Sequence, residues 1–270
     1  MHRFMQVHLF QLDITWEDRA PNFDRLITHC ERLTIDSGDL VVIPEMFSTG
    51  FSMNADRIAE PIDGQSPATE TLGTLAKEFA CCVVGGVAVR DGGEFYNEAI
   101  AALPGGRMAR YRKHQGFSVA GEDSAYREGD RLTTLDWGLG RIGLTICYDL
   151  RFPEIYRALA FAGAELLINI ANWPRRRVEH WVTLLRARAI ENQCYVAGVN
   201  RVGEDPNSHY PGRSILVDPQ GEIIADAGGA EGVVSCPIDF ETVRTWRAEF
   251  PALRDARRAN PPVDHFTCSD

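Results

Sequence analysis

A cysteine at the end of an apolar run is the residue of this sequence best placed to act as a nucleophile. Cys147 directly follows the run 142–146, which is typical of a buried strand, and Pro153 marks the expected start of a helix. The thiol therefore lies where a strand gives way to a turn. In α/β folds reactive groups are found at this place, at the carboxyl end of a strand and beside backbone N–H groups.

Two charged residues in other segments supply what a reactive thiol needs. A nearby positive charge lowers the pKa of a thiol, and proton transfer needs a base. Glu45 ends a second apolar run, 40–44, and Lys113 lies in a Tyr-Arg-Lys-His segment. Either residue alone would most simply be a solvated surface charge. Their occurrence together with Cys147, each beside an apolar strand, predicts a nucleophilic site that cleaves amides.

These residue types predict a reaction through a covalent intermediate. Attack of the Cys147 sulfur on an amide carbonyl gives a tetrahedral oxyanion, which the Lys113 ammonium and the backbone N–H of Tyr148 are expected to stabilise. Glu45 is expected to accept the thiol proton, pass it to the leaving nitrogen, and then activate the water that hydrolyses the thioester. This chemistry requires neither a metal nor an organic cofactor, so we expect none.

The elements that position these residues are predicted from periodicity and from turn residues. Strands are expected at 5–12, 40–44, 81–89, 95–103, 107–112, 142–146, 166–171, 195–199, 214–217, 222–225 and 232–238. Helices are expected at 21–35, 66–79, 153–162, 175–192 and 240–250, with a loop beside the site at 115–130. Strands and helices alternate without a linker or a repeat, which predicts a single α/β domain with two sheets covered by helices.

Composition narrows the class of protein. The 270 residues carry a formal net charge of -10, and the pI is near 5.2, which disfavours nucleic acid and anionic membrane surfaces as partners. No apolar run is long enough to span a bilayer and the first residues do not form a signal peptide, so we expect a cytoplasmic protein. The seven cysteines include no C-x-x-C pair, so neither a zinc site nor a disulfide framework is indicated.

Three segments around the candidate residues resemble the nitrilase, or carbon–nitrogen hydrolase, superfamily. They are Val-Ile-Pro-Glu-Met-Phe at 42–47, Tyr-Arg-Lys at 111–113 and Gly-Leu-Thr-Ile-Cys-Tyr-Asp-Leu-Arg-Phe-Pro-Glu at 143–154. The resemblance implies a four-layer α-β-β-α sandwich with a Glu-Lys-Cys site. It also implies a second glutamate after the lysine, which orients the lysine; the matching residue is Glu122, with Asp123 beside it.

The same resemblance carries expectations about domains and assembly. We expect 1–250 to form the carbon–nitrogen hydrolase domain and 251–270 to form a C-terminal tail that packs on a partner subunit. A homodimer is common in this superfamily, and the helices expected at 153–162 and 175–192 would pair across a two-fold axis.

Further segments are similar to the omega-amidase branch of the superfamily. They are Met-Phe-Ser-Thr-Gly-Phe-Ser-Met at 46–53, Ala-Asn-Trp-Pro at 171–174, Arg-Ala-Arg-Ala-Ile-Glu-Asn-Gln at 186–193, Asn-Arg-Val-Gly at 200–203 and Asp-Pro-Gln-Gly-Glu-Ile-Ile at 218–224. The likeness implies hydrolysis of the non-peptide C–N bond of a small anionic ω-amide, of the 2-oxoglutaramate or 2-oxosuccinamate type, to a carboxylate and ammonia.

Other functions stay open at this point. Hydrolases of N-carbamoyl amino acids or ureides and aliphatic nitrilases share the same three residues, and a catalytically idle interaction module would keep the same fold. One segment departs from the family pattern: His-Gln-Gly-Phe at 114–117 replaces the His-Leu-Phe of many relatives. Phe117 is expected to contribute to the wall that binds the substrate, whose size this departure would affect.

Residues near the nucleophile are candidates for substrate binding. Arg151 lies four residues after Cys147, about one helical turn away. Its guanidinium is expected either to bind a substrate carboxylate at two points or to pair with Glu154 or Asp149 and fix the turn. Asn172 and Trp173 follow the end of another strand and are expected to line the same pocket, with a core position as the alternative for Trp173.

Two further groups have competing interpretations. Arg175, Arg176 and Arg177 open the helix expected at 175–192, where positive charge is unfavourable. They are expected to be solvated or to draw anionic substrates to the mouth of the site. His114 and His180 are the candidate bases of a Cys-His hydrolase, although their spacing matches no motif of that type.

Overall fold

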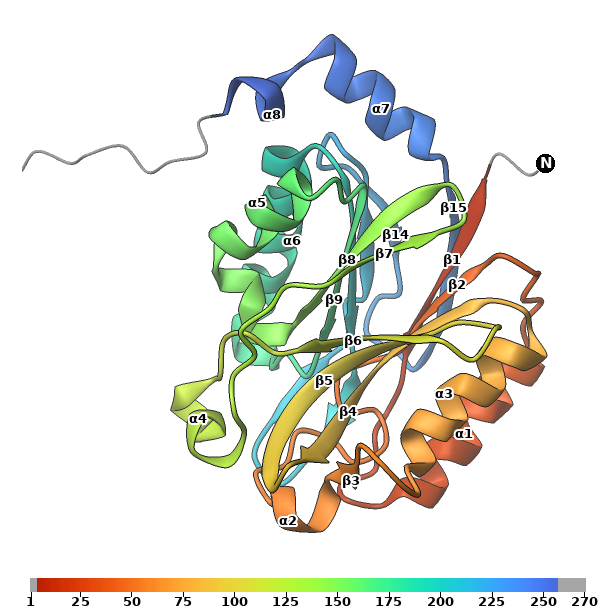
Figure 1. The fold of residues 1–270 in the computed structure, drawn as a ribbon, viewed down its shortest axis with the longest axis vertical. Helices are drawn as coiled ribbons and strands as arrows, with labels where there is room; N and C mark the ends of the chain where they lie inside the picture. The colour runs from red at the N-terminus through yellow and green to blue at the C-terminus, as the bar shows by residue number, and fades with distance from the viewer. Residues whose placement is uncertain (1–3, 257–270) are drawn as a thin grey trace, which may run out of the picture.

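The structure, a computed structural model that describes residues 4–256, contains two β-sheets that lie face to face (Figure 1). A pair of helices covers the outer face of each sheet. The four-layer α-β-β-α arrangement expected from the sequence is confirmed. No helix among the described residues is long and apolar enough to cross a membrane.

The first sheet has three parallel central strands with antiparallel strands on either side. Its order is β15 (Gly232–Ile238), β1 (Met5–Gln11), β2 (Leu40–Val42), β4 (Cys82–Asp91), β5 (Glu94–Ala102) and β6 (Met108–Arg112), and β3 (Glu60–Pro61) also pairs with β4. The strands β1, β2 and β4 are parallel. Because parallel strands end at one edge, the residues that follow β2 lie near that edge of the sheet.

The second sheet repeats this plan. Its order is β14 (Ile223–Asp226), β13 (Ile215–Val217), β10 (Tyr195–Asn200), β9 (Leu166–Ala171), β8 (Gly140–Ile146) and β7 (Thr134–Trp137), with β8, β9 and β10 parallel. A separate hairpin joins β11 (Val202–Glu204) to β12 (His209–Pro211). The carboxyl ends of β8 and β9 therefore face the same side of the molecule.

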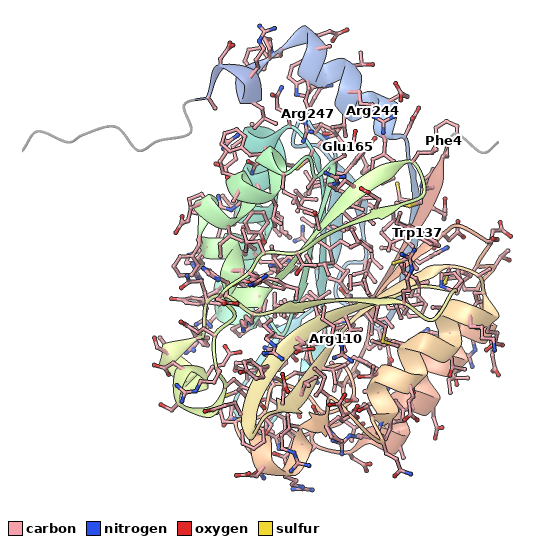
Figure 2. All side chains as sticks on the ribbon, in the orientation of Figure 1. Phe4, Arg110, Trp137, Glu165, Arg244 and Arg247 are labelled. Atoms are coloured by element: carbon pink, nitrogen blue, oxygen red, sulfur yellow. The ribbon has the colours of Figure 1, made fainter. Side chains whose placement is uncertain are left out.

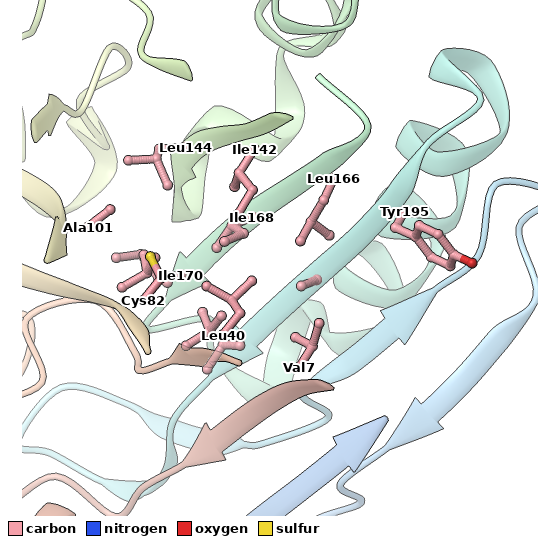
Figure 3. Close-up of a cluster of buried hydrophobic side chains, with 14 of the residues drawn as sticks. Val7, Leu40, Cys82, Ala101, Ile142, Leu144, Leu166, Ile168, Ile170 and Tyr195 are labelled. Atoms are coloured by element: carbon pink, nitrogen blue, oxygen red, sulfur yellow. The ribbon is translucent and has the colours of Figure 1, made fainter. Parts of the chain in front are cut away.

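The largest core cluster lies between the two sheets (Figure 3). Alternate residues of each strand point into it, such as Val7 on β1, and Leu144 and Ile146 on β8. The intervening residues of the central strands are also apolar and pack under helices, because these strands are buried on both faces. This double burial explains why the central strands appear in the sequence as continuous apolar runs.

Helices α1 (Arg19–Glu31) and α3 (Pro67–Glu78) pack on the first sheet, and α5 (Pro153–Phe161) and α6 (Val178–Asn192) pack on the second. Pro67 and Pro153 occupy the first turns of their helices, as the sequence predicts. The helix expected from 175 instead begins at Val178, after a separate 3-10 turn, Arg175–Arg177.

The sequence analysis missed several short elements. The strands β7, β11 and β12 have three or four residues, too few for an alternating pattern to be recognised. The segment expected to be a loop at 115–130 contains a 3-10 turn, Ser118–Ala120, and the one-turn helix α4 (Glu122–Ala125). Another one-turn helix, α2 (Ala55–Ile58), lies in the segment that follows Glu45.

The helix α7 (Phe240–Glu249) is attached to the end of the second sheet by arginines (Figure 2). Arg244 forms an ion pair with Glu165 at 2.8 Å, and Arg247 donates a hydrogen bond to the Ala164 carbonyl at 2.7 Å. The expected tail begins with α8 (Ala252–Asp255), whose Leu253 N–H donates to the Gln193 side chain. The rest of the tail, 257–270, lies outside the described residues, and so does its expected packing on a partner.

Candidate active site

Glu45 lies just beyond β2 and is fully buried. The chain passes directly over β4 at this point, since a Cβ atom on Gly86 would come within 2.5 Å of the Glu45 Cα. Only glycine fits that position. The next residue, Met46, has a φ of +45°, and the Phe47 N–H donates to the Gly86 carbonyl at 3.1 Å. The turn after β2 is therefore fixed against β4 so that the Glu45 carboxylate points into the protein.

Lys113 follows β6 and is buried between two carboxylates. Its Nζ donates to Glu45 Oε1 at 2.9 Å and to Glu122 Oε1 and Oε2 at 2.9 and 2.8 Å. Glu122 in turn accepts from the Phe117 N–H at 2.8 Å. The structure thus resolves the choice between the two adjacent acidic residues, because Glu122 is buried beside the lysine whereas Asp123 is exposed.

Asn97, on β5, joins the two carboxylates and was not predicted. Its Nδ2 donates to Glu45 Oε1 at 2.7 Å and to Glu122 Oε1 at 2.9 Å, while its backbone carbonyl accepts from the backbone N–H of Lys113. Asn97 shares the inner face of its strand with Ala99 and Ala101. A polar residue on an otherwise apolar face was the available signal.

Cys147 follows β8, at the start of the 3-10 turn Cys147–Arg151. Its φ of +43° lies in the left-handed region, which costs a non-glycine residue about 1 kcal/mol or more and is found mainly at functional sites. The carboxylate of Asp149 holds this turn, accepting from the Ile146 N–H at 2.8 Å, the Gln115 N–H at 2.9 Å and the Tyr111 hydroxyl at 2.7 Å. These bonds join the nucleophile segment to the segment of Lys113.

Asn172 connects the candidate base to the second sheet. Its backbone N–H donates to Glu45 Oε2 at 2.8 Å, and its Nδ2 donates to the Glu45 carbonyl at 2.7 Å. The Asn172 carbonyl in turn lies 4.0 Å from Cys147 Sγ. Residues that follow β2, β6, β8 and β9 therefore meet at one point between the sheets, as predicted for Glu45, Lys113, Cys147 and Asn172.

The charges of this cluster act on each other because it excludes water. Burial alone would lower the pKa of Lys113, but the carboxylates of Glu122 and Glu45 outweigh it and raise that pKa. Burial, followed by the negative charge of Glu45, raises the pKa of the Cys147 thiol well above its usual value, and Lys113 only partly opposes this. The positive charge of Lys113 acts to lower the thiol pKa, as expected, but burial and the nearby carboxylate of Glu45 outweigh it.

Cys147 opens into a cavity of about 440 Å³, large enough for a small molecule. The predicted substrate-binding residues Phe117, Arg151, Asn172 and Trp173 all line it, and so does Tyr148, which was predicted to support catalysis through its backbone N–H. Arg176 and Arg177, which were considered as attracting anionic substrates, also line it, as do Val119 and Ala120 of the loop expected beside the site. The sequence analysis did not single out the other lining residues: Trp16, Phe51, Met53, Pro174, Asp205, Asn207, Ser208 and Tyr210. The hairpin β11–β12 thus supplies one wall of the cavity.

Trp173 serves both roles that the sequence left open. It lines the cavity, but it is only 2% exposed and packs against Trp181 in the core, with ring centroids 5.4 Å apart. Arg151 lies 4.8 Å from the Trp173 ring and donates to His180 at 3.3 Å. Among residues 4–256, no carboxylate forms an ion pair with Arg151, and Asp149 is engaged elsewhere, so the expected brace by an ion pair is absent.

The two histidines considered as alternative bases are engaged elsewhere. His114 donates from Nδ1 to the Gly129 carbonyl at 2.7 Å, and His180 is exposed and accepts from Arg151. Glu45 is instead the titratable group whose charge acts most strongly on the thiol. In the described part of the chain, no group of three or more His, Cys, Asp or Glu side chains is arranged to hold a metal ion.

A four-layer sandwich with a cysteine, a lysine and two glutamates at its centre defines a class of hydrolase, and comparison with known proteins identifies the family. The model of the carbon–nitrogen hydrolase family matches residues 6–248, and the chain belongs to this family. It is therefore an enzyme that hydrolyses carbon–nitrogen bonds of amides.

Individual relatives refine this likeness. The chain is 38% identical over 256 residues to the omega-amidase YafV of Yersinia enterocolitica, covering 93% of this chain and 96% of that protein. It is 35% identical to a 2-oxoglutaramate amidase of Bacillus subtilis (strain 168), covering 93% and 97%. The crystal structure of XC1258 from Xanthomonas campestris, a CN-hydrolase superfamily protein with an arsenic adduct in its active site, has a TM-score of 0.89 and 36% identity, covering 97% and 100%. The predicted resemblance to omega-amidases is confirmed.

Proposed function

We propose that this enzyme removes the terminal amide of a small anionic ω-amide, of the 2-oxoglutaramate or 2-oxosuccinamate type, through a thioester on Cys147. The observation that carries the proposal is the buried Glu45–Lys113–Glu122 cluster beside Cys147, at one end of a cavity that three guanidiniums line. The names of the relatives, omega-amidase and 2-oxoglutaramate amidase, support the same substrate class.

The first half-reaction follows from the raised pKa of the thiol. Because Cys147 is a neutral thiol at neutral pH, its proton must leave as the sulfur attacks, and Glu45 is the carboxylate that accepts it. The S–C bond forms while the amide carbonyl becomes an oxyanion. The Lys113 ammonium, kept charged by its two carboxylates, and the Tyr148 N–H stabilise that oxyanion.

Glu45 completes the first half-reaction and then serves in the second. Glu45 passes its proton to the nitrogen, the C–N bond breaks and ammonia leaves. A water molecule, deprotonated by Glu45, then attacks the thioester, and the product carboxylate and the Cys147 thiol are released. Asn97 and Asn172 each donate to a different oxygen of Glu45, so the carboxylate keeps one orientation through both steps.

A substrate panel with an acyl-enzyme trap tests this proposal. We expect ammonia release from succinamate and 2-oxoglutaramate at rates well above those with N-carbamoyl-β-alanine or butyronitrile. Acid quenching during turnover, followed by mass spectrometry, should show the acyl group on the peptide that contains Cys147. Faster turnover of the carbamoyl compound or the nitrile would favour those functions, and no turnover of any compound would favour the idle module.

The matched control is Cys147→Ala, which removes the nucleophile but no buried charge. We expect it to fold normally and to lose about 10⁴-fold or more in kcat, since the other groups cannot replace a covalent nucleophile. Retention of a tenth of the wild-type rate would show that Cys147 is not the nucleophile. The homodimer and the cytoplasmic location expected from the sequence stay predictions.

A further inference from the structure

Three arginines bring positive charge to one cavity wall without carboxylate partners. Arg151, Arg176 and Arg177 all line the cavity that contains Cys147, and no carboxylate among residues 4–256 forms an ion pair with any of them. Asp205 lines the same cavity, but its carboxylate accepts hydrogen bonds from the Tyr210 hydroxyl at 2.6 Å and from two backbone N–H groups. The charges of these three guanidiniums are therefore not neutralised by a carboxylate of the described chain.

Arg177 differs from Arg175 and Arg176 in how far its side chain is buried. Arg175 and Arg176 are exposed, whereas Arg177 is half-buried and its guanidinium lies 5.2 Å from the Phe117 ring centroid. Burial, followed by repulsion from Arg176 and Arg151, lowers the pKa of Arg177. An anion bound here would offset both the desolvation and the repulsion.

The backbone around Arg177 is fixed. The Trp173 indole donates to the Arg177 carbonyl at 2.7 Å, and the Arg177 N–H donates to the Pro174 carbonyl at 3.0 Å. Arg177 is also the residue directly before α6, whose amino-terminal end carries partial positive charge. An arginine is unfavourable at this place in the folded protein, which is understandable if the position serves to bind an anion.

Arg151 is less available. Its guanidinium lies near the Trp173 ring and already donates to His180. Arg176 is exposed at the rim of the cavity. Of the three guanidiniums, the one of Arg177 combines partial burial, a fixed backbone and a position over the Phe117 ring in the cavity that contains Cys147.

We propose that Arg177 is the specificity-determining residue of this enzyme, binding the distal carboxylate of the substrate while the ω-amide lies at Cys147. This inference rests on the proposed function and assigns its substrate selectivity to one side chain. A planar guanidinium binds a carboxylate through two parallel hydrogen bonds, which a lysine cannot reproduce. The substrates selected would be short ω-amides that carry a carboxylate, in preference to neutral amides of equal size.

Two amides of matched shape test the assignment. Succinamate and isocaproamide have the same number of non-hydrogen atoms, but a carboxylate in the first is replaced by an uncharged branched alkyl group in the second. For Arg177→Gln we expect kcat/KM to fall by about 10- to 100-fold with succinamate, the worth of a charge-assisted contact, and by less than about 3-fold with isocaproamide. For Arg177→Lys, kcat/KM with succinamate should lie between the values for Arg177→Gln and the wild type.

Arg175→Gln is the matched control, because it removes the same charge from the same short turn. Arg175 lines a neighbouring cavity and not the one that contains Cys147. We expect it to leave the ratio of the two kcat/KM values unchanged. Inhibition by succinate, measured separately, should weaken in Arg177→Gln by a factor similar to the loss with succinamate, which a merely structural role would not produce.

The outcomes separate this assignment from the proposed function. Equal losses with both amides in Arg177→Gln, or an equal change of selectivity in Arg175→Gln, would overturn the assignment alone. A selective loss in Arg151→Gln but not in Arg177→Gln would also overturn it and would move the role to Arg151. A wild-type enzyme without preference for succinamate would overturn the proposed function and this assignment together.

Discussion

The charged residues at the two sides of the cavity differ in how they are paired. We call Glu45, Lys113 and Glu122 the floor, and Arg151, Arg176 and Arg177 the wall. At the floor, Lys113 lies between Glu45 and Glu122, all three are at most 3% exposed, and each is held by ion pairs. On the wall, three arginines are partly or largely exposed and none has a carboxylate partner in the described chain. The floor is complete without a ligand, whereas the wall has charge that only a ligand can neutralise.

This difference predicts different responses to mutation. Removing one charge from the floor leaves the remaining charges buried and unpaired, so stability and turnover of every substrate should fall. Removing one arginine from the wall relieves repulsion, so stability should hold while turnover of anionic substrates falls. Variants at the floor and on the wall therefore test whether the two sets of charges differ in this way.

The largest effect is expected at the floor for Glu45→Gln. We expect kcat to fall by about 10²- to 10⁴-fold with acidic and neutral amides alike, because the proposed general base is lost. The Glu45 charge raises the pKa of Cys147, so its removal should lower that pKa and increase the thiolate fraction at pH 7. Iodoacetamide should then modify Cys147 faster in the variant than in the wild type. Slower modification would contradict this account of the thiol.

Lys113→Ala should have the next largest effect. Loss of the oxyanion stabiliser should cost about 10²- to 10³-fold in kcat, and the two carboxylates left without a cation should destabilise the fold by about 3–5 kcal/mol. Urea unfolding followed by circular dichroism measures the second quantity. The double variant Lys113→Ala/Glu122→Gln should recover part of the stability but none of the activity. An unchanged kcat with a raised KM would move Lys113 from catalysis to binding.

The smallest effect is expected on the wall for Arg176→Gln. Because Arg176 is exposed at the rim, it should act on anionic substrates only at long range and should lower kcat/KM for succinamate by about 2- to 3-fold at low ionic strength. In about 1 M salt the difference should vanish, since the screening length is then only about 3 Å. A loss that persists in salt would instead indicate direct contact, and a loss of stability would contradict the contrast between wall and floor.

Part of the site could be predicted because Glu45 and Cys147 follow apolar strands, whereas Lys113 follows the mixed strand β6 and was found only through the family motif. The runs before Glu45 and Cys147 are apolar on both faces, since the two sheets bury them from one side and helices from the other. The strand β9 ends at Ala171 as predicted, so Asn172 and Trp173 also lie at the site. Parallel strands end at the same edge of a sheet, which explains why residues that follow these apolar runs lie close together.

Contacts between segments that are remote in sequence are decided only by the tertiary structure. Asn97 reaches Glu45 and Glu122 across the first sheet, and Asp149 joins the turn of Cys147 to Tyr111. The raised pKa of the thiol depends on the balance between burial, Glu45 and Lys113. This balance is set by the distances between these groups in the folded protein, which the spacing of residues in the sequence does not give.

The sequence by itself determined the family, the four-layer arrangement and the strand ends that carry the chemistry, because periodicity and local motifs are properties of neighbouring residues. The tertiary structure decided which charges are neutralised and which are not. The three consecutive arginines before α6 cannot be told apart from the sequence. In the structure Arg175 lines a neighbouring cavity, Arg176 lies at the rim, and Arg177 is half-buried near Cys147. That distinction arises from the packing of the turn before α6 against Trp173 and Phe117.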